Sequence, residues 1–228
     1  MPFQLSPGVA VVEKDFTSIV PAVATSTGAF AGDFQWGPVL EPVTIDSENN
    51  LVQRFGKPTD TNATSFFTAA NFLAYTNNLL VARADATALV NAVADGSAVK
   101  IKNTDDYLMT YSGGGNSIGE FAAKYPGTLG NSITISMADS AVFSTWDYKG
   151  QFDTIPGTSS YVDSRGGSSD ELHIVIIDAD CKWTGSAGTI LEKFAYVSKA
   201  SDAKRTDGTS NYYKDVINNG SKYIWWAS

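Results

Sequence analysis

The single histidine and the single cysteine of this chain are the first residues to consider for catalysis. His173 lies inside the apolar run 171–178, and a catalytic triad would need its imidazole beside a nucleophile and a carboxylate. The sequence contains no G-x-S-x-G motif or equivalent. Cys181 has no second cysteine with which to form a zinc pair or a redox pair, and a nucleophilic role would need His173 to fold back onto it. We therefore predict a structural or surface role for His173.

Acidic residues near the end of the same run are the next candidates. Asp178 and Asp180 are two residues apart, with Asp170 nearby, and α/β enzymes place reactive groups at the carboxyl ends of strands. A cation site or an acid/base pair is one interpretation, but the same residues commonly begin loops, and the glycine of a calcium loop is missing. The run Gly113-Gly114-Gly115 lacks the Lys-Ser/Thr and the helix of a phosphate loop. We predict no catalytic residue, no metal and no cofactor.

Charge and composition limit the possible partners. The chain has 228 residues with 24 acidic and 16 basic side chains, a net charge of −8, and this excess disfavours nucleic-acid binding. One cysteine allows no internal disulfide, which suits a reducing compartment. No basic segment followed by an apolar core begins the chain, and no apolar run approaches the roughly 20 residues of a membrane helix. We expect folding in the cytoplasm and no membrane insertion.

Apolar spacing predicts an α/β (α+β) fold, with a mixed sheet flanked by helices, a β-rich excursion and an extended N-terminal arm. A strand at 41–45 precedes a helix that begins at Asp46 or Ser47 and ends at Gly56. A second helix runs from Thr64 or Ser65 to Asn77, followed by a buried strand at 79–84. Because the order is strand, helix, helix, strand, we expect these two strands to be parallel.

From 85 to about 170 the segments are short, β-like and rich in glycine and serine. We expect strands in this excursion at 98–102, 107–111 and 131–137. After it we expect a buried strand at 171–178, a helix at 188–198, a short helix at 211–217 and a strand at 222–226. That last strand ends two residues before the chain does, which indicates a chain that is cut rather than finished.

The N-terminal segment is predicted to be an extended arm. Proline, glycine and valines branched at Cβ favour strand geometry there, and such a strand can pair with the sheet edge of a neighbouring molecule. The arm residues are Pro7, Gly8, Val9, Ala10, Val11, Val12 and Glu13. A small, polar connector follows, and we predict that it acts as a hinge: Ala22, Val23, Ala24, Thr25, Ser26, Thr27 and Gly28.

Six blocks along the chain carry a resemblance to a known family. They read SPGVAVVEKD, FAGDFQWGPVLEPV, LVQRFGKPTD, FFTAANFLAYTNNLLVARA, KYPGTLGNSITISM and NGSKYIWWAS. In this order they resemble the N-terminal part of the contractile tail sheath protein of T-even-like myophages. The family's chain continues well beyond Ser228, and residues 85–121 are short where T-even relatives carry a large outer insertion.

The resemblance implies a structural subunit of the virion that is assembled in the host cytoplasm. Sheath subunits form rings, typically hexameric, which stack helically around the tail tube protein and contract on a signal from the baseplate; the tail terminator is a further partner. By resemblance, residues 1–22 would form the arm and the start of an inner domain. Residues 23–84 and 171–228 would form a protruding body, and residues 85–170 an excursion within it. The arm would add a strand to a neighbour's inner-domain sheet.

Two other classes of protein remain as alternatives. A carbohydrate-binding or carbohydrate-active domain would place Trp225, Asp178 and Asp180 in one cleft. A different structural protein would be a tail tube or baseplate component, or a sheath-like protein of a bacterial contractile injection system. A tube protein would have a flat β-barrel in place of helices between strands.

Overall fold

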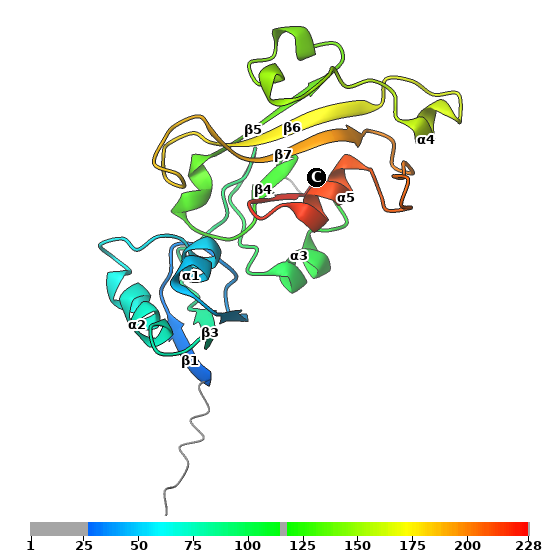
Figure 1. The fold of residues 1–228 in the computed structure, drawn as a ribbon. Coiled ribbons are helices and arrows are strands. Elements are labelled where there is room, and N and C mark those ends of the chain that lie inside the picture. Colours follow the sequence, from blue (N-terminus) through cyan, green and yellow to red (C-terminus); the bar gives the residue numbers. More distant parts are fainter. Residues whose placement is uncertain (1–26, 115–117, 228) are drawn as a thin grey trace, which may run out of the picture.

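The computed structural model describes residues 27–114 and 118–227. Figure 1 shows an elongated arrangement in which a small sheet with two helices lies at one end and a longer three-stranded sheet lies toward the other. We call residues 27–83 the first unit and residues 90–227 the second unit.

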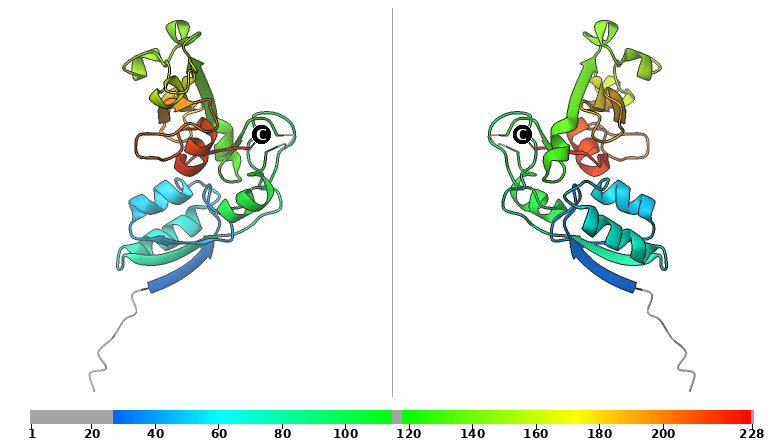
Figure 2. Two further views of the ribbon diagram at one scale, coloured as in Figure 1. Left: turned by 90° about the vertical axis from the view of Figure 1, so that its right-hand side faces the viewer. Right: turned by 90° about the vertical axis from the view of Figure 1, so that its left-hand side faces the viewer.

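The first unit is a three-stranded mixed sheet with two helices. Its elements are β1 (Thr27–Gly32), β2 (Pro42–Ile45), α1 (Glu48–Phe55), α2 (Ala63–Leu73) and β3 (Asn78–Arg83). The strand order is β1-β3-β2, and β3 is parallel to β1 and antiparallel to β2. Both helices cover the same face of the sheet (Figure 2). This mixed sheet flanked by helices confirms the predicted fold class.

The predicted parallel pairing of the strands at 41–45 and 79–84 is wrong. These strands are β2 and β3, and Ile45 lies opposite Leu79 in an antiparallel ladder. Two helices separate them, and α2 returns the chain to the end of the sheet where β2 finished. The parallel partner of β3 is β1, so the crossover connects β1 to β3 and contains β2 and both helices.

The helices of the first unit begin and end for local reasons. The Ser47 side chain accepts a hydrogen bond from the Asn50 amide and caps α1, while Gly56 closes the helix with a φ of 83°. Both were predicted at these positions, because a short hydroxyl side chain satisfies a free amide and glycine tolerates positive φ. Helix α2 ends at Leu73, earlier than the predicted Asn77.

The predicted connector overlaps the start of the described fold. Thr27 and Gly28, its last two residues, lie in β1 and pair with β3. The rest of the connector and the whole arm Pro7–Glu13 lie outside the described residues, so the hinge and the arm stay predictions.

The second unit contains an antiparallel sheet, a two-stranded ribbon and short helices. The sheet has the order β5-β6-β7, and the ribbon pairs β4 with β8. Its strands and α-helices are α3 (Thr104–Thr110), β4 (Phe121–Ala123), β5 (Ile133–Asp139), α4 (Ser160–Asp163), β6 (Glu171–Asp178), β7 (Thr189–Ser198), α5 (Tyr213–Gly220) and β8 (Ile224–Trp226). Three short 3-10 helices span Thr128–Ser132, Phe143–Thr145 and Lys149–Gln151.

The helix predicted at 188–198 is a strand, β7. Its apolar residues mimic a helical period because the pairing with β6 shifts register twice, between Leu172 and Ile174 and between Ile176 and Ile177. Each irregularity adds a residue and changes the face toward which the following side chains point.

The strand predicted at 107–111 is also wrong, because these residues belong mainly to α3. The Asn103 side chain accepts from the Asp106 amide and caps the helix, and Asp105 and Asp106 lie in its first turn. Acidic residues there are favoured by the free amides and the positive end of the helix dipole.

Segments from the predicted excursion pair with segments from the predicted body. Strand β5 forms the ladder with β6, and β4 forms the ribbon with β8. The apolar cluster beneath them combines Phe121 with Ile174, Ile176 and Ile224. The domain boundaries at 84 and 170 stay a prediction, and these pairings join residues from both sides of the second boundary.

Candidate functional site

His173 is a structural residue, as predicted. Its ring is buried and stacks on Phe152 with centroids 4.1 Å apart. Nδ1 accepts a hydrogen bond from the Tyr196 amide, so in the neutral ring Nε2 donates to the Thr154 carbonyl oxygen at 3.0 Å. Tyr196 has a positive φ of 54° inside β7, which fits its amide being directed at the imidazole. Both ring nitrogens are occupied in holding three segments together.

Asp178 organises the loop after β6. Its buried carboxylate accepts hydrogen bonds from the Ser132 hydroxyl and from the amides of Lys182, Trp183 and Thr184. Burial opposes ionisation, but the hydrogen bonds from Ser132 and Thr184 outweigh it and hold the pKa of Asp178 below its usual value. The carboxylate therefore stabilises the backbone of the loop that follows β6.

The neighbouring candidates do not join Asp178 in one site. Asp180 and Cys181 are exposed, and the Asp180 amide donates to the Ser132 hydroxyl. Asp170 is buried elsewhere, where it accepts from the hydroxyls of Ser159 and Ser198. Among the residues that the structure describes, no three His, Cys, Asp or Glu side chains come together as potential metal ligands.

Trp225 is not available as a platform for a sugar ring. It is 2% exposed, and one face of its ring stacks on Tyr107 with centroids 4.1 Å apart. The Lys124 ammonium lies 4.1 Å from the ring centroid, and the indole N–H donates to the Lys124 carbonyl oxygen. The shared cleft that a carbohydrate-active domain needs is not formed by Trp225 and the buried Asp178.

Arg83 joins the first unit to the second. It ends β3, is 1% exposed, and donates to the carbonyl oxygens of Phe34, Gly37 and Pro126 at 2.7–3.0 Å. Burial lowers the pKa of Arg83 to about 10, and the negative charges of Asp33 and Asp85 oppose that shift. The planar guanidinium, with five donors, suits a junction of several carbonyl groups.

A glycine allows this approach of the two units. Gly127 has a φ of 140°, and a Cβ atom there would lie 2.8 Å from the Gln35 carbonyl oxygen and 3.2 Å from the Arg83 guanidinium. Any larger residue would therefore push the 126–127 turn away from the 33–38 loop.

Trp36 makes the second connection across the junction. It is 2% exposed and lies edge-on to Tyr125 and Trp183, with ring centroids 5.5 and 4.9 Å away. Buried aromatic pairs in this geometry contribute about 0.5–1.5 kcal/mol each beyond the area they bury. Together with Arg83, Trp36 makes the two units one body.

The first sheet has one covered face and one open face. Phe30, Val81 and Val43 lie side by side and pack toward α1 and α2. The residues of the opposite face alternate with these along each strand and are exposed or half-buried; apart from Leu80 they are small: Ala29, Ala31, Pro42, Thr44, Leu80 and Ala82. A second layer can approach such a surface closely.

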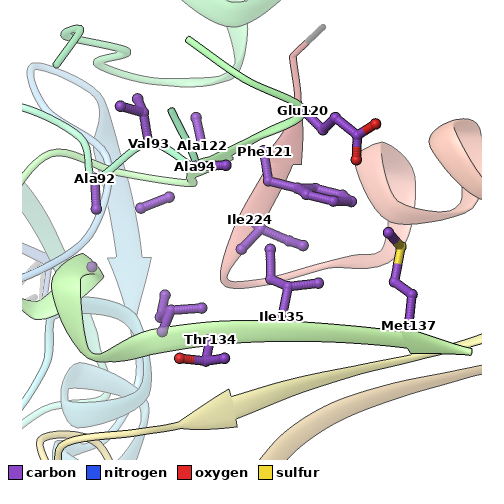
Figure 3. Close-up of a pocket in the computed structure, with 13 residues that line it drawn as sticks. Ala92, Val93, Ala94, Glu120, Phe121, Ala122, Thr134, Ile135, Met137 and Ile224 are labelled. Carbon is purple, nitrogen blue, oxygen red and sulfur yellow. The ribbon is translucent and has the colours of Figure 1, made fainter. Parts of the chain in front are cut away.

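The second unit carries an apolar groove beside an open strand edge. Strand β5 is the outer strand of its sheet among the described strands. Figure 3 shows Ile135 and Met137 of β5 facing Phe121 and Ile224 of the ribbon across a pocket of about 470 Å³. Glu120 lies at the end of the groove near Met137. No helix among the described residues is long and apolar enough to cross a bilayer.

Comparisons with known proteins identify relatives of this chain. Residues 25–84, which include the whole first unit, match the family model described as "Tail sheath protein Gp18 domain III N-terminal region". The chain is 35% identical over 190 residues to the tail sheath protein of Salmonella phage ViI, covering 82% of this chain and 28% of that one. It is 40% identical over 120 residues to the tail sheath protein of Vibrio phage KVP40, covering 49% and 18%.

The comparisons also found a third phage relative and a solved structure. The chain is 36% identical over 116 residues to the tail sheath protein of Enterobacteria phage T4, covering 51% of this chain and 17% of that one. The fold is similar to the crystal structure of a sheath tail protein from Listeria innocua, with a TM-score of 0.43 and 16% identity, covering 89% and 30%. The chain thus spans 17–28% of the length of the three phage relatives.

These relatives define a class of structural proteins of phage tails. The chain corresponds to the N-terminal region of the tail sheath proteins of myophages. This confirms the resemblance found in the sequence, and members of the family are components of the virion tail sheath.

Sequence reasoning missed the two residues of the junction. Arg83 was expected only as part of a buried strand, although a charged residue ending an apolar strand signals a guanidinium that needs several acceptors. Trp36 appeared only within the block FAGDFQWGPVLEPV. Its partner Trp183 is distant in sequence, and nothing local in the sequence connects them.

Proposed function

We propose that this chain is a building unit of a contractile tail sheath. Its copies associate into rings, typically hexameric in this family, which stack helically around a tail tube and contract on a signal from the baseplate to drive the tube through the host envelope. The tail terminator closes the stack. The 35% identity to the ViI tail sheath protein over 190 residues carries this proposal.

The arm Pro7–Glu13 links neighbouring copies in this proposal. A strand that adds about four backbone hydrogen bonds to a neighbour contributes on the order of 2–6 kcal/mol net. Repeated around a ring, such links hold subunits together while the contacts between their bodies change. The small, polar residues 22–26 supply the flexible connection that this exchange requires.

The junction of the two units supports a body that moves without deforming. Arg83 and Trp36 fix the first unit on the second through buried hydrogen bonds and aromatic contacts. Rigid bodies that rotate about short connections are a common way to change between two packings. Contraction then alters contacts between copies and leaves each copy's interior unchanged.

Electron microscopy of the purified chain, alone and with the phage's tail tube protein, tests the proposal. We expect rings or tubes that form around the tube protein, and we expect a variant lacking residues 1–14 to lose them. The matched control replaces Val9, Val11 and Val12 with threonine, which keeps the β-branched shape and the strand preference. A chain that stays monomeric with the tube protein present at high concentration contradicts the proposal.

A further inference from the structure

Trp36 of the first unit is inserted among residues of the second unit. Its ring packs with four residues that we call the socket: Ala123, Tyr125, Leu129 and Trp183. Ala123 lies in β4, and Leu129 lies in the 3-10 helix Thr128–Ser132. Trp183 comes from the connection between β6 and β7, residues 179–188, which we call the strap. One wall of the socket is therefore carried by a loop.

The strap is fastened at Asp178. The carboxylate of this residue accepts hydrogen bonds from the successive amides of residues 182–184 at 2.8–3.0 Å. The Ser132 hydroxyl donates to the same carboxylate at 2.7 Å, which ties the strap to the 3-10 helix that carries Leu129. Two walls of the socket thus depend on one carboxylate.

The closed strap carries two local costs. Cys181 has a φ of 61°, a strained conformation for a residue with a Cβ atom, which persists only where surrounding contacts impose it. The indole N–H of Trp183 is buried and has no acceptor among the residues that the structure describes, which is unfavourable for a buried donor. Apart from Ala179 and Trp183, the residues of the strap are exposed, so little buried surface opposes its opening.

The Arg83 attachment between the units is of a different kind. Its guanidinium is 1% exposed and donates to carbonyl oxygens of both units, including those of Phe34 and Pro126. Breaking this attachment would leave a buried charge and several carbonyl groups without partners. Of the two attachments, the strap is the one that opens more readily.

We infer that the strap opens and closes as a local step, and that Asp178 holds it closed. In the closed state Trp183 covers Trp36, and this is the rigid body that the proposed function uses. In the open state the Trp183 indole N–H gains an acceptor from solvent and Cys181 relaxes, while the Arg83 hydrogen bonds still hold the units together. Because both units belong to one chain, the inference does not depend on assembly of the sheath.

Hydrogen exchange of indole N–H groups in the full chain tests the inference. The chain has five tryptophans, and their NMR signals are assigned by replacing one at a time with phenylalanine. Trp225 is the internal reference, because its indole N–H donates to the Lys124 carbonyl oxygen in the interior of the second unit. We expect the Trp183 indole to exchange faster in deuterated water than the Trp225 indole, since opening of the strap alone releases it.

Substitution at Asp178 tests the fastening point. Asp178→Asn keeps the size of the side chain but directs an amide group at backbone amides, so we expect Trp183 exchange to accelerate about tenfold or more. The matched control is Asp180→Asn, exposed in the same strap, which should leave that exchange unchanged. If Asp178→Asn does not fold, Ser132→Ala takes its place, and we expect an acceleration of about threefold from the loss of one hydroxyl donor.

Arg83→Met separates opening of the strap from global unfolding. We expect this variant to accelerate exchange of the Trp225 indole and to leave that of the Trp183 indole unchanged. Equal exchange of the two indoles in the parent chain, parallel acceleration of both in Arg83→Met, or equal effects of Asp178→Asn and Asp180→Asn on Trp183 overturns the inference. None of these outcomes bears on ring formation, which the deletion of residues 1–14 tests separately.

Discussion

Arg83 donates a hydrogen bond to the carbonyl oxygen of Pro126 across 2.7 Å, although the two residues belong to different units of the molecule. The same guanidinium donates to Phe34 and Gly37 in its own unit. One side chain thereby satisfies carbonyl groups that would otherwise be buried without a donor. The position of the first unit relative to the second depends on it.

Replacement of Arg83 by methionine tests this dependence. The variant keeps the apolar stem but leaves buried carbonyl oxygens without donors, each worth about 1–3 kcal/mol. We expect the free energy of unfolding to fall by about 2–4 kcal/mol in urea titrations. The control is Arg54→Met on the exposed side of α1, which should change stability by less than about 0.5 kcal/mol. Equal effects of both variants would show that Arg83 has no special role.

Removal of the Asp178 carboxylate should unravel the loop that follows β6. Asp178→Ala leaves three backbone amides without their acceptor, and we expect a loss of about 2–4 kcal/mol in urea unfolding. Asp180→Ala is the control, since that side chain is exposed. If both alanine variants are equally stable, the carboxylate contributes nothing to the loop.

The acid dependence of stability should identify the same group. Because the pKa of Asp178 is lower in the folded protein than its usual 3.8, the folded state binds its proton less readily than the unfolded state. Its contribution is complete above the unfolded pKa and is lost as the pH falls through the folded pKa. We expect Asp178→Ala to lose less stability than the parent chain when unfolding is compared at pH 6 and pH 3.

Lys124 should give a dependence of the same sign, an increase of stability with rising pH, but in the alkaline range. Burial lowers its pKa from 10.5 to about 8 in the folded protein, opposed by the charge of Glu192. Between these values the unfolded state binds more protons, so this group makes the fold more stable as the pH rises. Tyr125 and Tyr223, whose pKa values are raised by burial, act in the other direction only near and above about pH 10.

Urea midpoints at pH 7 and pH 9.5 measure the contribution of Lys124. The difference between them should shift toward higher stability at pH 9.5 in the parent chain relative to Lys124→Met, which cannot titrate. Lys57→Met serves as the surface control. A Lys124→Met protein with the same pH dependence as the parent would show that Lys124 keeps an ordinary pKa.

Stiffening the connector should separate assembly from contraction. In a full sheath, Ala24→Pro with Ser26→Pro restricts the backbone ahead of β1, so we expect rings to form but not to contract. Glycine at the same two positions keeps the chain flexible and should leave both steps intact. Electron micrographs that show normal contraction of the proline variant would exclude a hinge in residues 22–26.

Local signals in the sequence predicted much of the first unit. Helix α1 was predicted from Ser47 and Gly56, and its apolar stripe contains the buried Leu51 and Phe55. The strand 171–178 was predicted at its observed bounds because a continuous apolar run of that length suits a buried strand. Helix α1 depends on interactions between residues near in sequence, and the continuous apolar run of 171–178 records burial of that strand on both faces.

Errors arose where partners distant in sequence decide the structure. Helical spacing was predicted in β7 because two bulges against β6 alter its alternation, and no property of β7 alone reveals them. The open edge of β5 likewise depends on which strands lie next to it. Conversely, missing partners in the sequence predicted a structural or surface role for His173 and no catalytic role for Asp178, and the hydrogen bonds show what those side chains do.

The parallel ladder between β1 and β3 has a mechanical consequence. Six residue pairs, from Thr27 with Asn78 to Gly32 with Arg83, run side by side from the point where the arm and connector enter the described fold. A pull on Thr27 along the strand loads this ladder in shear, so its hydrogen bonds share the force instead of opening one after another as in a peeled hairpin. If a neighbouring copy holds the arm, tension on the arm would act along β1 and load the β1–β3 ladder in shear, the direction in which the ladder resists rupture best.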